Sequence, residues 1–214
     1  MSFAIAVLLS GNGSNLQAIM NAIAQHELDV VIKVVISDRL DAKGLERARD
    51  AGIPAIFIEP AKYQLREQFD DALSVILNDY HVSLVVLAGF MRILSDKFVS
   101  RYLGKLINIH PSLLPKYKGL NTHQRVIDAG ELEHGASVHF VTPKLDDGPI
   151  IIQSGVEVVA GESSEQLKQK IHKIEHIIYP RAINWISKAR VELKNGRVFL
   201  DGLVIDEIKH NIVI

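Results

Sequence analysis

The chain has 214 residues, 48% of them hydrophobic, which is enough apolar surface for a folded core. Its 24 lysine and arginine residues balance 25 acidic residues, so no global field would attract nucleic acid or an anionic membrane surface. The lack of cysteine excludes a disulfide framework, a thiol nucleophile and a cysteine-ligated metal.

The beginning of the chain is apolar, but it lacks a basic segment and leads directly into a glycine turn. It therefore predicts a first strand and not a signal peptide. No apolar run approaches the ~20 residues needed to cross a bilayer. We expect a cytoplasmic protein with no nucleic-acid partner and no membrane partner.

Apolar strands and amphipathic helices alternate along the first half of the chain. We expect strands at residues 4–9, 30–36, 55–58, 84–88 and 106–109. We expect helices at residues 14–23, 43–51, 64–79 and 95–101, with Ser14 capping the first and Gly52 closing the second. The third helix should bury Leu65, Phe69, Leu73, Ile76 and Leu77. The alternation predicts a Rossmann-like α/β fold, a mostly parallel sheet covered by helices on both faces.

The pattern changes after Gly119. A helix is expected at residues 123–129, followed by strands at residues 137–141 and 150–158 whose spacing favours antiparallel pairing. Residues 163–166 form a capping box that opens a long helix to about Arg190, which Pro180 should kink. Residues 194–197 predict a final hairpin. We find no linker or repeat, so we expect one domain.

Two polar side chains interrupt the apolar strand that begins at Leu106. Asn108 and His110 are two residues apart, so they share one face of an extended chain, and Pro111 favours an extended conformation for His110. The pair should lie at the carboxyl end of a strand, where α/β sheets keep their chemistry. An amide that donates to an oxyanion, beside an imidazole that exchanges a proton, suits acyl transfer. The alternative is a strand end with two satisfied polar groups.

Asp146 and Asp147 lie in a loop that ends in glycine and proline. Such aspartates are common turn formers, and this interpretation stays open. A carboxylate in a loop that leaves a neighbouring strand could also reach His110 and help its imidazole to keep a proton.

A glycine loop, residues 11–15, links the first strand to the first helix. Its main-chain amides and the helix N-terminus suit a phosphate group. A dinucleotide site would need a third glycine, and Leu16 occupies that place, although Asp38 at the end of the second strand keeps the dinucleotide interpretation open. We favour a phosphate monoester, with a plain tight turn as the other alternative.

Residues 172–176 match the H-x-x-E-H pattern of one group of zinc proteases. His172 and His176 would share a helix face, but a zinc site needs a third ligand with supporting hydrogen bonds, and none is apparent in the residues that follow. We therefore expect no metal here.

An apolar loop follows the fourth strand. Gly89 would permit close approach of a ligand, and the loop carries one arginine, Arg92. A flat aromatic ligand could be walled by Phe90, Met91, Ile93 and Leu94. The alternative is the edge of the core.

Four motifs taken together resemble those of one family. They are Ser-Gly-Asn-Gly-Ser-Asn at residues 10–15, Ala-Gly-Phe-Met-Arg-Ile-Leu at 88–94, Asn-Ile-His-Pro-Ser-Leu-Leu-Pro at 108–115 and Leu-Asp-Asp-Gly-Pro at 145–149. From about Val7 to about Trp185 the chain resembles the phosphoribosylglycinamide formyltransferases, folate-dependent enzymes of purine synthesis. The resemblance implies a single formyltransferase domain over residues 1–214. It would comprise a nucleotide-binding half (1–105), a catalytic and folate-binding half (106–190) and a C-terminal hairpin and tail (191–214).

The resemblance also implies the reaction, which transfers the formyl group of 10-formyltetrahydrofolate to the glycine amine of phosphoribosylglycinamide. No bound cofactor or metal is implied, because the folate is a consumed co-substrate, and the enzyme would act on these small molecules as a monomer or homodimer. The catalytic residues would be Asn108, His110 and Asp146. The nucleotide would contact Gly13, Ser14, Asn15, His172, Lys173, Ile174 and Glu175. The folate would contact Arg66, Met91, Arg92, Ile93, Leu94, Asn108, Thr142, Pro143, Lys144, Leu145 and Asp146.

One position departs from the family pattern, which often has two glycines after the catalytic aspartate. Asp147 takes the first of these places and offers a second carboxylate to His110.

Other functions of the same fold make different demands on the sequence. Methionyl-tRNA formyltransferase would need an additional RNA-binding domain and formyltetrahydrofolate hydrolase a regulatory domain, and we expect neither in a chain of this length. A non-catalytic nucleotide-binding module would be indicated by loss of Asn108, His110 or Asp146, and all three are present.

Overall fold

The structure, a computed structural model, describes residues 2–205. The chain divides into two compact units, Met1–Asn108 (unit 1) and Ile109–Ile214 (unit 2). The end of the predicted C-terminal tail, after residue 205, lies outside the described residues.

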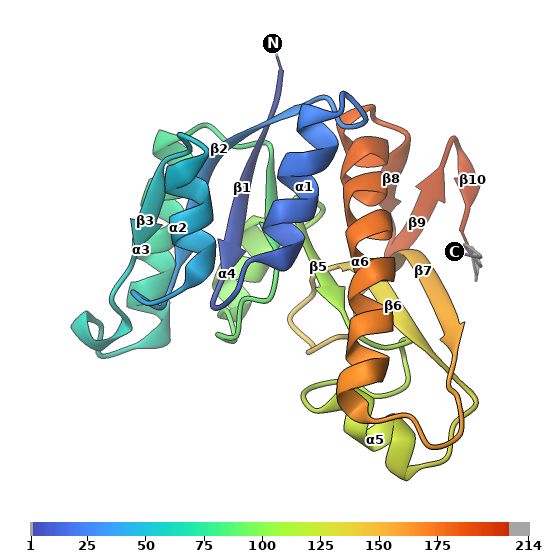
Figure 1. Cartoon of the computed structure of the whole chain (residues 1–214). Helices are drawn as coiled ribbons and strands as arrows, with labels where there is room; N and C mark the ends of the chain where they lie inside the picture. The colour runs from blue at the N-terminus through green and yellow to red at the C-terminus, as the bar shows by residue number, and fades with distance from the viewer. Residues whose placement is uncertain (1, 206–214) are drawn as a thin grey trace. The chain divides into compact units, whose positions relative to one another are not determined.

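Unit 1 alternates strands with helices (Figure 1). Its strands are β1 (Phe3–Leu9), β2 (Val30–Ser37), β3 (Ala55–Phe57), β4 (Leu84–Leu87) and β5 (Leu106–His110), whose last two residues belong to unit 2. Its helices are α1 (Ser14–Ala24), α2 (Lys43–Asp50), the short 3-10 helix η1 (Pro60–Lys62), α3 (Arg66–Asp79) and α4 (Asp96–Arg101). The strands pair in parallel in the order β3-β2-β1-β4-β5, as the alternating pattern predicts.

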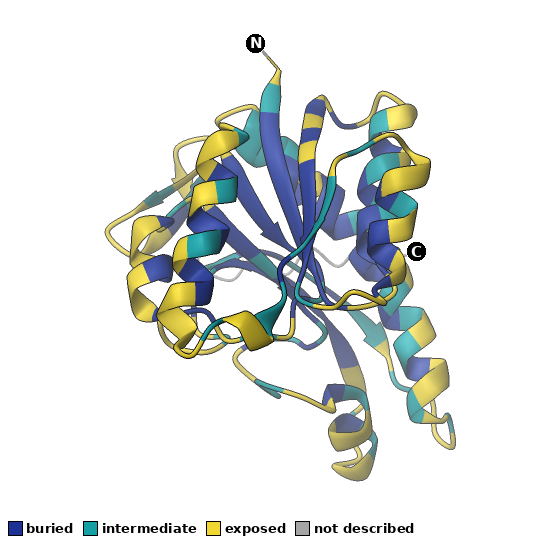
Figure 2. Cartoon of the chain, turned by 90° about the vertical axis from the view of Figure 1, so that its left-hand side faces the viewer, coloured by how far each residue is buried: buried dark blue, intermediate teal, exposed yellow. Residues whose placement is uncertain are grey.

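The strands of unit 1 form its buried centre (Figure 2). Residues 4–9 of β1 and all four residues of β4 are buried, which explains why these segments are apolar without alternation. α1 packs beside α2, and α3 packs beside α4. The first pair lies in front of the strands in Figure 1 and the second pair behind them, so helices cover both faces.

One helix of unit 1 begins later than predicted. α3 starts at Arg66, because the Gln68 side chain accepts hydrogen bonds from the main-chain N–H groups of Gln64 (3.0 Å) and Leu65 (3.2 Å). Leu65 therefore precedes the helix and is 60% exposed, so its predicted burial is wrong. The other predicted core residues of this helix are buried or half-buried: Phe69, Leu73, Ile76 and Leu77.

Unit 2 contains α5 (Thr122–Asp128), β6 (Glu133–Phe140), β7 (Ile150–Glu157), α6 (Ser164–Ser187), β8 (Val191–Lys194), β9 (Arg197–Leu200) and β10 (Leu203–Val204). β6 and β7 pair antiparallel, as predicted, and β8 to β10 form a second antiparallel sheet. The hydrogen-bonded strand order of the main sheet is β3-β2-β1-β4-β5-β6-β7. The predicted mostly parallel sheet, with antiparallel strands in the C-terminal half, is confirmed.

The long helix α6 begins with the predicted capping box. Ser163 accepts a hydrogen bond from the main-chain N–H of Gln166, whose side chain accepts one from the N–H of Ser163. The helix continues through Pro180 to Ser187, and the kink stays a prediction. After it, Asn195 and Gly196 adopt positive φ angles of 51° and 75°, which form the predicted hairpin turn between β8 and β9.

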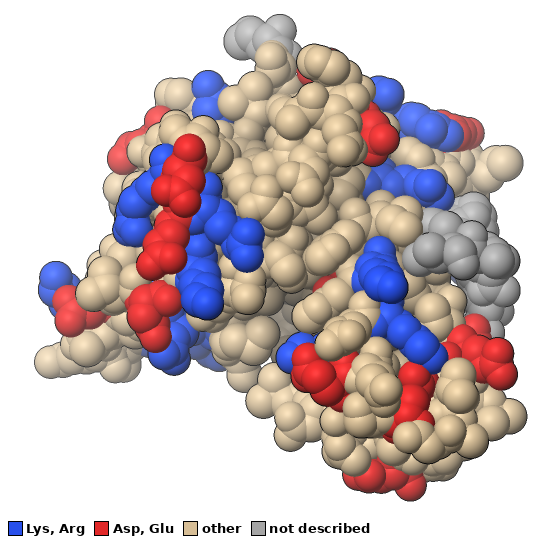
Figure 3. All heavy atoms as spheres, in the orientation of Figure 1, with Lys and Arg blue, Asp and Glu red and all other residues tan. Residues whose placement is uncertain are grey.

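No helix among residues 2–205 is long and apolar enough to cross a membrane. On the face shown in Figure 3, basic and acidic side chains are interspersed, in agreement with the formal net charge of −1.

Candidate active site

The glycine loop of unit 1 lies against the start of α2. Gly13, and not Ser14, occupies the cap position of α1, with a left-handed φ of 75° and no side-chain cap, so the predicted capping role of Ser14 is wrong. A Cβ atom at Gly13 would lie 2.7 Å from the Gly44 Cα atom, and the Gly44 N–H donates to the Gly11 carbonyl at 3.1 Å. Glycine at position 13 is therefore required by backbone conformation and by the close approach of α2.

Arg47 of α2 also holds the glycine loop. Its guanidinium donates to the main-chain oxygen of Asn12 (2.9 Å), to the Asn12 side-chain oxygen (3.0 Å) and to Gln17 Oε1 (3.0 Å). The first N–H groups of α1 follow directly, and such groups have no carbonyl partner within a helix. The loop is thus a braced helix N-terminus of the kind that binds phosphate.

The apolar loop after β4 divides into buried and exposed residues. Phe90 and Leu94 are only 9% and 7% exposed and hold the loop to the core, whereas Met91 and Ile93 are 64% and 62% exposed. Of the four residues predicted to wall a ligand, these two present apolar surface to solvent. Gly89 has a φ of 76°, which favours glycine at the start of the loop.

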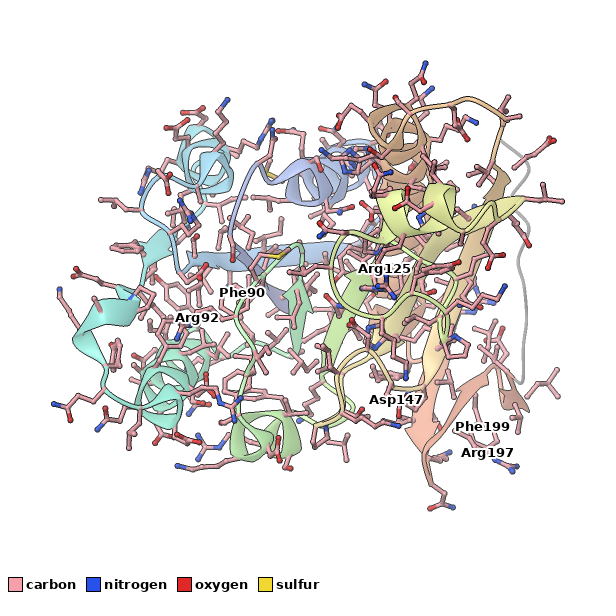
Figure 4. The ribbon with its side chains drawn as sticks, turned by 90° about the horizontal axis from the view of Figure 1, so that it is seen from below. Phe90, Arg92, Arg125, Asp147, Arg197 and Phe199 are labelled. Atoms are coloured by element: carbon pink, nitrogen blue, oxygen red, sulfur yellow. The ribbon has the colours of Figure 1, made fainter. Side chains whose placement is uncertain are left out.

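Two arginines of the predicted folate site lie on or near α3. Arg66 is exposed in its first turn. The Arg92 guanidinium lies 4.5 Å from the ring centroid of Phe69, a cation–π contact that fixes its direction. Arg92 is labelled in Figure 4.

Asn108 and His110 both lie on β5, as predicted. Asn108 is half-buried and His110 is 5% exposed. Because side chains alternate along a strand, the amide and the imidazole project from the same face of β5.

Within unit 2, His110 faces two oxygen acceptors. Its Nδ1 lies 3.4 Å from Asp146 Oδ2, and its Nε2 lies 2.9 Å from the main-chain oxygen of Tyr117. The Gly119 N–H donates to the same Asp146 oxygen at 2.9 Å, which fixes the carboxylate. A carbonyl and a carboxylate can only accept, so this geometry suits an imidazole with a proton on each nitrogen.

A second histidine lies near the same carboxylate. His139 Nδ1 donates to the Phe140 carbonyl at 2.9 Å, and His139 Nε2 lies 3.9 Å from Asp146 Oδ1. Burial lowers the pKa of His139, so this ring is neutral near pH 7. His139 thus contributes no positive charge that would compete with His110 for Asp146.

Asp147 makes different contacts from Asp146. It forms ion pairs with Lys118 and with Lys144, the latter at 2.7 Å. The two lysines lower the pKa of Asp147 to about 2, and Lys118 has the larger effect. Asp147, labelled in Figure 4, is therefore an ionised partner of two lysines, and Asp146 is the carboxylate that contacts His110.

The predicted nucleotide-binding turn of α6 is partly buried. Glu175 is 5% and Ile174 1% exposed, whereas Lys173 is exposed and His172 half-buried. The His172 and His176 rings stack with centroids 6.1 Å apart. Among residues 2–205, no group of three or more histidine, cysteine or acidic residues could hold a metal ion, and the expectation of no metal stays a prediction.

The comparison with known families assigns this fold to the formyl-transfer class of enzymes. Residues 3–183 match the family described as formyl transferase, and the chain belongs to this family. The predicted resemblance and the predicted enzyme class are confirmed.

Several similar proteins carry the same name. The phosphoribosylglycinamide formyltransferase of Escherichia coli strain K12 is 48% identical over 198 residues, 92% of this chain and 93% of that protein. The Haemophilus influenzae enzyme of the same name is 44% identical over the same shares of the two chains. The solved structure of the Coxiella burnetii phosphoribosylglycinamide formyltransferase, in complex with CHES, superposes with a TM-score of 0.92 at 50% identity, covering 95% of this chain and 96% of that one.

Proposed function

We propose that this chain transfers the formyl group of 10-formyltetrahydrofolate to the glycine amine of phosphoribosylglycinamide, a step of de novo purine biosynthesis in the cytoplasm. The observation that carries the proposal is the contact of His110 with Asp146 in a chain that is 48% identical to a phosphoribosylglycinamide formyltransferase. The enzyme acts on two small molecules as a monomer or homodimer, with the folate as a consumed co-substrate.

The reaction needs a site that stabilises negative charge and moves a proton. The neutral amine attacks the formyl carbon, and the electron pair of the C=O bond moves to oxygen. Asn108 and the protonated His110 donate hydrogen bonds to this oxyanion. In the free enzyme the Tyr117 carbonyl accepts a hydrogen bond from the Nε2 proton of His110. In the intermediate this proton is available to the oxyanion, which is a stronger acceptor than a carbonyl. Asp146 keeps the ring oriented through its contact with Nδ1.

Collapse of the intermediate re-forms the C=O bond and breaks the bond from carbon to the donor nitrogen of the folate. That nitrogen takes up a proton and the attacking amine gives one up, so the products are formylglycinamide ribonucleotide and tetrahydrofolate. His110 is suited to pass this proton, because both ring nitrogens can carry one.

The remaining residues are assigned to binding. Gly13, Ser14 and Asn15 bind the phosphate at the start of α1, and the α6 turn of residues 172–175 binds the ribose and glycinamide through His172 and Glu175. The folate contacts Arg66, Arg92 and the exposed side chains of Met91 and Ile93, with Leu94 behind them. The loop of Thr142, Pro143, Lys144 and Leu145, which leads to Asp146, receives the pterin.

The test is formyl transfer by the purified protein from 10-formyl-5,8-dideazafolate to phosphoribosylglycinamide, followed by donor absorbance. We expect turnover that requires both substrates. Equal loss of the formyl group without the nucleotide would indicate a hydrolase, and ligand binding without turnover would indicate a non-catalytic module.

A further inference from the structure

Asp38 has no part in the proposed reaction, although its position after β2 is compatible with a dinucleotide site. Its Oδ1 atom accepts a hydrogen bond of 2.6 Å from the Ser10 hydroxyl. Ser10, at the end of β1, is 7% exposed, so this bond is largely shielded from water. The carboxylate is therefore engaged within unit 1, and its partner is a serine that immediately precedes the glycine loop.

The Ser10 hydroxyl also joins β1 to the folate-binding loop. It accepts a 2.8 Å hydrogen bond from the main-chain N–H of Met91, while the main-chain N–H of Ser10 donates to the Gly89 carbonyl at 3.0 Å. A hydroxyl has one proton, and Ser10 uses it in the hydrogen bond that it donates to Asp38. The hydroxyl oxygen therefore faces the Met91 N–H with a lone pair. Ser10 consequently has no side-chain proton to offer a phosphate.

We propose that Ser10, oriented by Asp38, is a positioning residue for the folate-binding loop, residues 89–94. The hydroxyl fixes the main chain at Met91, two residues after Gly89 with its positive φ. The side chains of Met91 and Ile93 face solvent from this part of the loop. The inference rests on the proposed function and deepens it. It predicts an effect on the folate alone, although Ser10 adjoins the loop assigned to the nucleotide.

The test compares four variants by calorimetric titration with 10-formyl-5,8-dideazafolate and, separately, with phosphoribosylglycinamide. Ser10→Ala leaves the Met91 amide without its acceptor, and we expect the folate analogue to bind about tenfold more weakly, with the nucleotide changed less than about twofold. Asp38→Ala should cause part of this loss. Asp38→Asn should bind nearly as the wild type, because an amide oxygen still accepts the hydroxyl proton.

Asp41→Asn is the matched control. It removes a carboxylate from the same segment, but one that forms an exposed 3.1 Å ion pair with Arg39 and does not contact Ser10. We expect it to bind both ligands as the wild type does. Amide hydrogen exchange at Met91 provides a readout without ligand, and it should be faster in Ser10→Ala and Asp38→Ala only.

Two results would overturn the inference: unchanged folate affinity in Ser10→Ala, or a loss of nucleotide affinity as large as that of the folate. The second would assign Ser10 to the phosphate. If the wild type bound neither ligand, the proposed function would fail, while the exchange rate at Met91 would still decide whether the Ser10 hydroxyl holds this loop.

Discussion

At the level of single residues, two adjacent carboxylates have different partners. Asp146 contacts His110 and accepts from the Gly119 amide, whereas Asp147 is bound by two lysines. We expect Asp146→Asn to lower turnover about a hundredfold or more, with nucleotide affinity nearly unchanged. Asparagine keeps the size and can still accept from Gly119, but it removes the negative charge opposite the imidazole. Steady-state kinetics and nucleotide titration measure the two effects.

Asp147→Asn is the control for this experiment. It removes the same charge one residue away, and its ion pairs are about one-third exposed at the carboxylate, so turnover should change by no more than about threefold. A collapse of turnover in Asp147→Asn, with Asp146→Asn unaffected, would mean that the wrong carboxylate has been assigned. If neither variant mattered, the proton-holding role would be wrong.

At the level of elements, the glycine loop and α2 depend on each other. We expect Gly13→Ala to lower the free energy of unfolding by about 1–3 kcal/mol, because the new methyl group meets Gly44 and the backbone is left-handed. Gly11→Ala adds the same group where no atom lies within 4 Å, so it should leave stability nearly unchanged. Urea unfolding measures both. Equal stability of the two variants would show that the contact with α2 does not require glycine.

A pair of histidines joins α5 to β6. His123 Nδ1 and His134 Nε2 are 3.0 Å apart, and burial lowers the pKa of both rings from 6.5 to about 4. Other charged or titratable groups that act on the pair are His110, Glu165, Lys168 and His172.

Between pH 6.5 and about pH 4, the folded state therefore binds fewer protons than the unfolded chain. The contribution of the two neutral rings to the free energy of unfolding should be fully present above pH 6.5 and should be lost as the pH drops towards about 4. His134→Asn should flatten this dependence, measured as the free energy of unfolding at several pH values. An unchanged slope in the variant would exclude His134 as a cause.

At the level of the whole molecule, the proposed chemistry uses only side chains and the two substrates. We expect prolonged treatment with a chelator to leave formyl transfer intact, because in the proposed reaction the amine attacks the formyl group directly and needs no Lewis acid. Activity lost to the chelator and restored by added zinc would contradict the assignment of Glu175 to the ribose. It would direct attention to the His172 and His176 pair.

Much of this fold could be predicted from the sequence, because buried parallel strands are uniformly apolar and their helices are amphipathic. β10 was missed, since Leu203 and Val204 form too short a run to show a pattern. Asn108 and His110 were visible as polar residues in an apolar strand. Their surroundings were not, because Tyr117 contributes a main-chain carbonyl and Gly119 a main-chain N–H, and every residue type except proline has both groups.

Other contacts depend on strand register and loop conformation. Ser10 meets Asp38 because β1 and β2 pair with Leu9 opposite Ser37, which places the two following residues side by side. The ion pair of Lys118 with Asp147 joins positions 29 residues apart, and the sequence pattern around neither residue indicates it. Single-sequence periodicity contains no information on such pairings.

The position of one aromatic residue determines what an optical experiment would observe. The only tryptophan, Trp185, lies in α6 of unit 2, with the Arg190 guanidinium 6.0 Å from its ring. Indole fluorescence therefore reports unfolding around α6, whereas far-ultraviolet circular dichroism registers the helices of both units. If the two signals have the same midpoint in denaturant, the two units unfold in one cooperative transition. If the midpoints differ, each unit has its own transition.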